Sequence, residues 1–202
     1  MEYRFDELPG DLIYKLMASS IVPRPIAWIT SMSEAGVVNA APFSFFNMMG
    51  SNPPVIAVGL QANNGALKDT AQNILETKEF VVNLVPFSMA EVMNESSKGF
   101  ASDINELVEL GIETMPATLV KAPLIKNSPV KMECTLMSAV QTGEAQYVMI
   151  AEVKIFHIAD EFVLDPAECY IDTDKMALIS RMHGRGWYSK NRDLFLLERP
   201  NQ

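Results

Sequence analysis

The sequence predicts a single, mainly β domain in which an antiparallel barrel carries helical insertions. Segments of strand-like composition outnumber helical ones and follow one another as hairpins. No regular alternation of strand and helix, which a doubly wound parallel sheet requires, runs through the chain. The 202 residues contain no repeat and no linker rich in Gly or Pro. One core can serve a chain of this length, so one domain is expected over residues 1–202.

The expected strands begin with a hairpin. Strand-forming residues fill 26–32, the stretch 33–36 supplies a turn that contains Gly36, and 37–41 continues in extended form. Four further runs are apolar or β-branched and are bounded by turn residues, which predicts four more strands. These are expected at residues 55–60, 79–85, 130–140 and 146–156, the last two forming a second hairpin around Gly143.

Helical insertions are expected at three places. The first helix follows Asp11, whose carboxylate can accept hydrogen bonds from the free N–H groups of a helix start, and it should end near Ser20. The second opens at Asp69. Apolar residues recur at helical spacing between Met89 and Leu110, which predicts two more helices.

Composition excludes several classes of function. Lys and Arg number 16 against 25 Asp and Glu, which gives a formal net charge of −9. Such a chain repels phosphate backbones and anionic lipids, so neither nucleic acid nor a membrane is expected as a partner. The two cysteines lack the spacing of zinc ligands, and no metal site is expected. Without a signal-peptide or membrane-spanning segment, a cytoplasmic location is expected.

The catalytic inventory is small. Only His157 and His183 are histidines, and no Ser or Cys stands in a nucleophile motif, so a hydrolytic triad is disfavoured. His157 lies in a strand pattern, which indicates a structural role. His183 stands between arginines, two glycines and two aromatic residues in 181–188. This stretch is either a segment that approaches a planar ligand or a glycine-rich turn with solvated cations.

No Rossmann fingerprint and no P-loop occurs, so a nucleotide would have to be held in another way. Lys68, Asp69 and Thr70 offer one: a cation followed by the start of a helix, whose free N–H groups suit a phosphate. Asp69 and Thr70 are also ordinary helix caps, and that interpretation stays open. In residues 39–47, polar side chains stand among three phenylalanines, which favours contact with a flat heteroaromatic ring.

Five short motifs follow one another along the chain. They are Arg24-Pro25-Ile26-Ala27-Trp28-Ile29-Thr30, Asn39-x-Ala41-Pro42-Phe43-Ser44-x-Phe46-Asn47, Pro53-Pro54, Lys68-Asp69-Thr70-x-x-Asn73 and Glu79-Phe80-Val81-Val82-Asn83. In order and spacing they resemble the flavin reductase-like family, which has the FMN-binding split-barrel fold. The resemblance spans roughly residues 12–188. It implies a six-stranded antiparallel split barrel that forms a homodimer, with FMN in a groove near the subunit interface.

The resemblance also assigns site residues. It implies that the cofactor side of the first hairpin is lined by Arg24, Trp28, Ile29 and Thr30. The flavin ring and the ribityl chain would meet Asn39, Ala41, Pro42, Phe43 and Ser44. The phosphate would face Ser51, Lys68, Asp69 and Thr70.

The implied activity is that of an FMN-binding oxidoreductase, similar to NAD(P)H:flavin reductases, which passes hydride or electrons through the flavin. His183 and Arg185 are candidates for controlling access of a pyridine nucleotide donor. The Gly-Asp-His signature of many such reductases is absent, and residues 181–185 look more like the flavoredoxin-like branch. An alternative is therefore a flavoredoxin-like electron carrier with a protein redox partner. A split barrel without flavin is a third.

Overall fold

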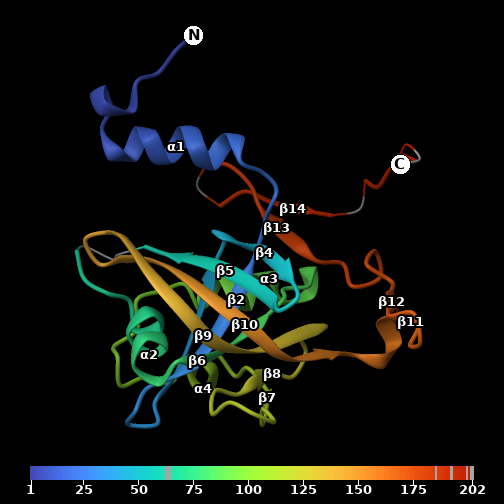
Figure 1. The fold of residues 1–202 in the computed structure, drawn as a ribbon. Helices are drawn as coiled ribbons and strands as arrows, with labels where there is room; N and C mark the ends of the chain where they lie inside the picture. The colour runs from blue at the N-terminus through green and yellow to red at the C-terminus, as the bar shows by residue number, and fades with distance from the viewer. Residues whose placement is uncertain (62–64, 185, 192, 199, 201–202) are drawn as a thin grey trace.

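The computed structural model describes residues 1–61, 65–184, 186–191, 193–198 and 200 (Figure 1). Its main feature is a seven-stranded sheet in which every neighbouring pair is antiparallel. In spatial order the strands are β3 (Val38–Phe43), β2 (Ala27–Met32), β6 (Glu79–Asn83), β9 (Val130–Gly143), β10 (Gln146–Ile158), β5 (Pro54–Leu60) and β4 (Phe46–Ser51). The prediction of a mainly β, antiparallel fold with helical insertions is confirmed.

The expected number of six strands is wrong, because β4 adds a seventh at the outer side of β5. Residues 46–51 include Asn47 and Gly50, which are weak strand formers, and expose Met48 and Met49. The segment therefore lacks the alternation that marks a half-buried strand.

The sheet is a split barrel rather than a closed one. Its edge strands β3 and β4 are not paired with each other, yet only Ser44 and Phe45 separate the end of one from the start of the other. Because two residues span only about 7 Å, the edges of the sheet must lie close together. The sheet thus curls round on itself without a hydrogen-bonded seam between its first and last strands.

Both predicted hairpins are confirmed. In the first, β2 pairs with β3 from Ala27 opposite Phe43 to Met32 opposite Val38. Gly36 has a φ of 84°, which a tight turn requires and a glycine adopts without strain. In the second, β9 and β10 form the longest ladder, which irregularities interrupt near Ile150 and Val153. These irregularities bend the strands, as curvature of the sheet demands.

Smaller strands surround the barrel. A three-stranded sheet joins β1 (Arg24–Pro25) to the C-terminal hairpin of β13 (Ile179–Arg181) and β14 (Tyr188–Lys190). Two further pairs are β7 (Thr114–Met115) with β8 (Leu124–Ile125), and β11 (Val163–Asp165) with β12 (Tyr170–Ile171). Single 3-10 turns occupy Phe5–Glu7, Phe87–Met89 and Asp160–Phe162.

Four α-helices stand where helices were expected. They are α1 (Gly10–Ser20), α2 (Asp69–Thr77), α3 (Ala90–Glu95) and α4 (Glu106–Glu109). Asp11 does not cap α1, because the helix begins at Gly10, two residues earlier than expected, and the Asp11 carboxylate pairs with Lys15 instead. Figure 1 shows α1 at the top of the molecule, beside β13 and β14, and α2 against the barrel. Within the described residues, no helix is long and apolar enough to cross a membrane.

The core has two main parts. One contains the large buried side chains Ile29, Phe80 and Met149, together with Ile74 of α2. The other gathers residues from β2, β3, α3 and α4 around Trp28. The strand β2 contributes to both parts, since its two faces are both buried.

Glu133 forms a buried cluster of hydrogen bonds with residues 118–120 and His157, called the Glu133 clamp below. Its carboxylate is fully buried and accepts hydrogen bonds from the amides of Thr118, Leu119 and Val120. The ring nitrogen Nε2 of His157 lies 2.6 Å from Glu133 Oε1. His157 therefore has the structural role that its strand pattern predicts.

Candidate functional site

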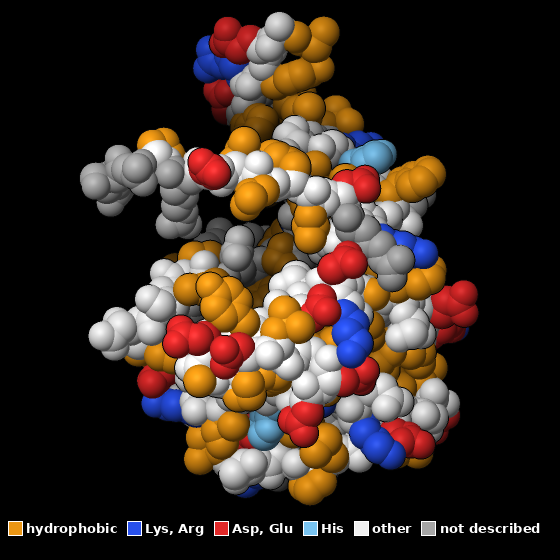
Figure 2. All heavy atoms as spheres, turned by 90° about the vertical axis from the view of Figure 1, so that its right-hand side faces the viewer, with side chains coloured by type: hydrophobic (Ala, Val, Ile, Leu, Met, Phe, Trp, Pro, Cys, Tyr) orange, Lys and Arg blue, Asp and Glu red, His pale blue; other side chains and the backbone are white. Residues whose placement is uncertain are grey.

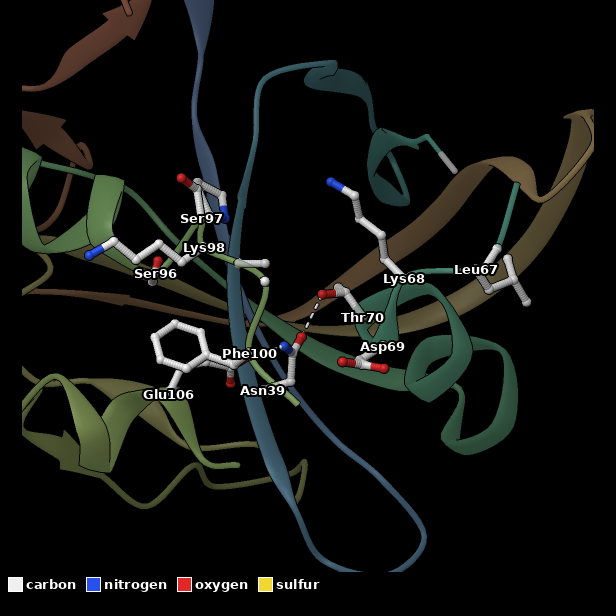
Figure 3. Close-up of a pocket in the computed structure, with 14 residues that line it drawn as sticks. Asn39, Leu67, Lys68, Asp69, Thr70, Ser96, Ser97, Lys98, Phe100 and Glu106 are labelled. Carbon is white, nitrogen blue, oxygen red and sulfur yellow. Dashed lines mark hydrogen bonds between the residues drawn. The ribbon is translucent and has the colours of Figure 1, made fainter. Parts of the chain in front are cut away.

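A polar cavity of about 310 Å³ opens between β3, the start of α2 and the segment that follows α3 (Figure 3). Its walls come from three parts of the chain that are far apart in sequence. They comprise Asn39, Ala41 and Pro42; Ala66, Leu67, Lys68, Asp69 and Thr70; and Ser96, Ser97, Lys98, Gly99, Phe100 and Glu106.

Lys98, one of the two lysines that line this cavity, forms an ion pair with Glu95. The other is Lys68. It is half-buried, and its Nζ lies 5.4 Å from the centroid of the Phe43 ring. Burial lowers the pKa of the Lys68 ammonium below its ordinary value. Among the residues that the structure describes, no carboxylate forms an ion pair with Lys68. The cavity therefore holds a positive charge that an anionic ligand could neutralise.

The N-terminus of α2 reinforces that charge. Lys68 precedes the helix in extended conformation, and its carbonyl accepts the amides of Ala71 and Gln72. The amides of Asp69 and Thr70 belong to the first turn and have no acceptor within the helix. The positive end of the helix dipole lies at the same place, so the site suits a phosphate. The side-chain Nδ2 of Asn73 donates to Ser31 Oγ at 3.1 Å and docks α2 on the barrel.

A chain of buried hydrogen bonds runs through another wall of the cavity. The hydroxyl of Thr70 donates to Asn39 Oδ1 at 2.6 Å, the bond drawn in Figure 3. Asn39 Nδ2 donates in turn to Glu106 Oε1 at 2.6 Å. The second oxygen of Glu106 accepts the amide of Ala40 at 3.1 Å. The chain joins α2, β3 and α4.

Glu106 is a residue of this cavity that sequence reasoning missed. It is only 5% exposed, and burial raises the pKa of its carboxyl, while bonds from Asn39 and Ala40 partly oppose that rise. The nearby Asp69 carboxylate raises the pKa further. In the sequence Glu106 is one acid among 25, at the start of a short helix capped by Asn105. Nothing in the sequence indicates that Glu106 contacts Asn39 and Ala40, which are 67 and 66 positions away along the chain.

Comparison with known families identifies the family to which this fold belongs. The model of the flavin reductase like domain matches residues 17–175 of the chain. The protein belongs to the flavin reductase-like family.

Solved structures agree with that family. The chain is similar to nitrilotriacetate monooxygenase component B from Bacillus cereus, with 31% identity, a TM-score of 0.91 and 98% of each chain covered. It is also similar to 2-nitrobenzoate 2-nitroreductase NbaA from Pseudomonas fluorescens, with 30% identity, a TM-score of 0.89, and 99% and 96% of the two chains covered. Flavoredoxin of Desulfovibrio vulgaris (Miyazaki F) shares the fold at 16% identity and a TM-score of 0.78, with 98% and 97% covered.

The structure brings together six of the residues that the family resemblance assigns to the cofactor. They are Asn39, Ala41, Pro42, Lys68, Asp69 and Thr70, all of which line the Lys68 cavity. Phe43 lies behind this wall, since its ring is buried in the core beneath Lys68. The two motifs concerned, 39–43 and 68–70, thus meet as the family resemblance implies.

Trp28, Ile29 and Thr30 do not line the cavity. All three are fully buried in β2, which is covered on both faces. Thr30 donates its hydroxyl to the carbonyl of Pro123 at 2.6 Å. Ser51 is exposed at the end of β4 and also stands outside the cavity.

Arg24 and Ser44 line a second, larger cavity of about 660 Å³ beneath α1. The guanidinium of Arg24 is buried and donates to the carbonyls of Ala18, Ile21 and Met182. Burial lowers the pKa of Arg24, but the carbonyls at the C-terminal end of α1 offer its charge favourable partners. In this chain Arg24 therefore ties α1 to the C-terminal hairpin.

The described residues of 181–188 form a turn near Arg24 rather than a wall of the Lys68 cavity. Arg181 donates to the carbonyls of Gly184 and Trp187, and its guanidinium lies 4.9 Å from the centroid of the Tyr188 ring. The His183 ring stacks on Trp187 with a centroid distance of 6.0 Å. Arg185, the other candidate for donor access, lies outside the described residues.

Proposed function

We propose that the protein binds FMN in the Lys68 cavity and acts as an oxidoreductase that passes hydride or electrons through it. The observation that carries the proposal is the half-buried Lys68 ammonium at the N-terminus of α2, which has no carboxylate ion-pair partner among the described residues. A dianionic phosphate is the ligand group that satisfies a cation and two free helix amides together.

The hydrogen-bond donors and acceptors that line the Lys68 cavity fit FMN. Lys68 and the amides of Asp69 and Thr70 would hold the phosphate. Asn39 and Thr70, which join in the buried hydrogen-bond chain, would meet the hydroxyls of the ribityl group. Ala41 and Pro42 would offer the small apolar contacts that a planar ring needs. When bound, FMN supplies the redox chemistry, so no side chain of the protein has to act as a nucleophile or general base.

The electron donor in this proposal is a pyridine nucleotide, NADH or NADPH. The 31% and 30% identity with a monooxygenase component and a nitroreductase supports an oxidoreductase. A flavoredoxin-like carrier with a protein redox partner is a second candidate. The observation that favours it is the turn of 181–188, whose described residues stand away from the Lys68 cavity.

We also propose that the protein is a homodimer. Apolar side chains that a monomer would leave in water are exposed on α1, directly after its last residue and on β4, among them Met17, Ile21, Met48 and Met49. Figure 2 shows hydrophobic side chains among polar and charged ones over the upper part of the face that it draws. Exposed apolar side chains gathered on neighbouring elements are typical of an interface, and two-fold dimers are the commonest assembly of identical chains.

Purified protein tests these proposals directly. Yellow colour, or tight binding of added FMN followed by flavin fluorescence, is expected. Anaerobic addition of NADH or NADPH should then bleach the flavin if the protein is the proposed oxidoreductase. Colour that neither nucleotide bleaches would favour the carrier instead. Failure to bind FMN at all would contradict both.

A further inference from the structure

We infer that Glu106 is a positioning residue that fixes which groups of Asn39 and Thr70 donate hydrogen bonds and which accept them. The wall of the Lys68 cavity thereby accepts hydrogen bonds from ligand hydroxyls. The inference rests on the proposed function, because it names what the cavity recognises beyond a phosphate. It assigns to a buried acid outside the family motifs a part in ligand selection.

The argument begins at Ala40. Its backbone N–H can only donate, and it points at Glu106 Oε2. In the structure Asn39 Nδ2 donates to Glu106 Oε1 at 2.6 Å, the arrangement that an ionised Glu106 carboxylate, which can only accept, selects. Asn39 Oδ1 is thereby turned to Thr70, 2.6 Å away, and must accept. Each bond in the chain dictates the direction of the next.

Thr70 is the last residue in this series of hydrogen bonds. Its single hydroxyl hydrogen is committed to Asn39, which leaves only oxygen lone pairs for a ligand in the cavity that Thr70 lines. Lys68, Lys98 and the helix amides supply donors, whereas Thr70 and Asp69 supply acceptors. A ligand that matches both sets carries an anionic group and, beside it, hydroxyl donors. A polyol phosphate has this pattern.

Changing Glu106 to Gln would reverse the direction of the hydrogen bonds between Glu106, Asn39 and Thr70. The introduced carboxamide must still accept from the Ala40 amide, so its NH₂ group would face Asn39. Asn39 would then have to turn its own oxygen toward that donor and its NH₂ group toward Thr70. The Thr70 hydroxyl would become an acceptor within the chain and direct its hydrogen at the cavity. A ligand hydroxyl that donated in the unchanged protein would meet a donor.

A double variant would restore the original direction. In Asn39→Asp combined with Glu106→Gln, the new carboxamide donates to the new carboxylate, and the second oxygen of that carboxylate accepts from Thr70. Shape and net charge are nearly those of the unchanged protein, because the acid and the amide have only exchanged places. A residue that merely filled space would not be rescued in this way.

The test compares riboflavin with lumiflavin, which has the same ring system but no ribityl chain. We expect Glu106→Gln to weaken riboflavin binding about ten-fold or more, the effect of replacing a hydrogen bond by two opposed donors. Lumiflavin affinity should be unchanged, and the double variant should bind riboflavin more tightly than Glu106→Gln alone, because the direction of the hydrogen bonds is restored even though Asn39 is itself changed. Glu109→Gln, on the exposed side of the same short helix, is the matched control and should have no effect.

Thr70→Val provides a second route if Glu106→Gln does not fold, because it removes the accepting hydroxyl while keeping the side-chain shape. It should weaken riboflavin but not lumiflavin. Equal riboflavin affinity in Glu106→Gln or Thr70→Val and the unchanged protein would overturn the inference. So would a loss of both ligands together, or a folded double variant that stays as weak as the single one. No binding of either flavin by the unchanged protein would overturn the proposed function as well.

Discussion

The Lys68 ammonium lies 5.4 Å from the centre of the Phe43 ring, and Phe43 is itself buried in the core of the barrel. The cation that defines the candidate site therefore rests on the same strand that supplies Asn39, Ala41 and Pro42. Val38, Ala40 and Phe43 of β3 pack in the core while its other residues line the cavity, so the packing of the barrel positions the site. Because α2 is docked on β2 through Asn73 and Ser31, the helix start is held in place as well.

Arg24 should matter for stability more than for flavin binding. Arg24→Ala removes three bonds to backbone carbonyls and should lower the free energy of unfolding by about 2–4 kcal/mol, since charge-assisted bonds contribute about 1.5–3 kcal/mol each and are not additive. Chemical denaturation measures this loss. Arg4→Ala, which breaks an exposed ion pair, is the control. Reduced FMN affinity at unchanged stability would instead support a cofactor role for Arg24.

Glu133 should make the protein sensitive to acid. Burial raises the pKa of Glu133, but the amides of residues 118–120 and the His157 ring lower it more, so the net shift is downward from 4.5. The native state then holds fewer protons than the unfolded one at acid pH. This contribution is complete above the ordinary carboxyl pKa and is lost as pH falls through the lowered value.

Denaturation curves of Glu133→Gln across that range check this expectation. The variant should be less stable by about 2 kcal/mol at neutral pH, and the difference from the unchanged protein should shrink toward acid pH. Glu161→Gln, an exposed change, should leave the curve intact. A Glu133→Gln variant as stable as the unchanged protein at neutral pH would show that the clamp contributes nothing.

The exposed apolar surface of α1 and β4 predicts a dimer. Light scattering should give about twice the chain mass of 22.4 kDa, because burying this surface removes apolar area from water. Met48→Glu should shift the protein toward monomer, whereas Leu164→Glu, an equally exposed residue on β11, should not. A monomer at saturating FMN would contradict the prediction.

His183 should affect electron transfer if the C-terminal turn controls donor access. His183→Ala should then slow reduction by NADH or NADPH several-fold while FMN affinity and melting temperature stay nearly constant. Arg185→Ala should behave in the same way. Stopped-flow bleaching measures the rate. A lower melting temperature at an unchanged rate would identify the segment as a structural turn, consistent with the stacking of His183 on Trp187.

Local signals in the sequence sufficed for most of the barrel. The turn at Gly36 and the β-branched arms around Gly143 predict both hairpins, and the structure has them. The sequence does not predict β4, because pairing with β5 rather than the composition of residues 46–51 determines its extended conformation. Asp11 is not a cap because the helix begins at Gly10, directly after Pro9, so Asp11 lies within its first turn.

The candidate site was predictable where it is local and not where it is assembled by tertiary contact. Lys68, Asp69 and Thr70 are adjacent in sequence and open a helix, so their chemistry can be inferred from the chain. Glu106 depends on a contact with Asn39 across 67 positions. Burial of β2 on both faces removes Trp28 and Thr30 from the cavity, and no pattern within that strand indicates it.

The most direct test of the proposed flavin site is the affinity of Lys68→Ala for FMN and for riboflavin, which lacks the phosphate. Titrations followed by flavin fluorescence should show FMN binding weakened by roughly 1.5–3 kcal/mol, the strength of a charge-assisted hydrogen bond, with riboflavin binding nearly unchanged. Lys126→Ala, which removes an exposed lysine paired with Glu113, is the control and should bind both ligands normally. Equal losses for FMN and riboflavin in Lys68→Ala would show that Lys68 does not contact the phosphate and would contradict the central claim.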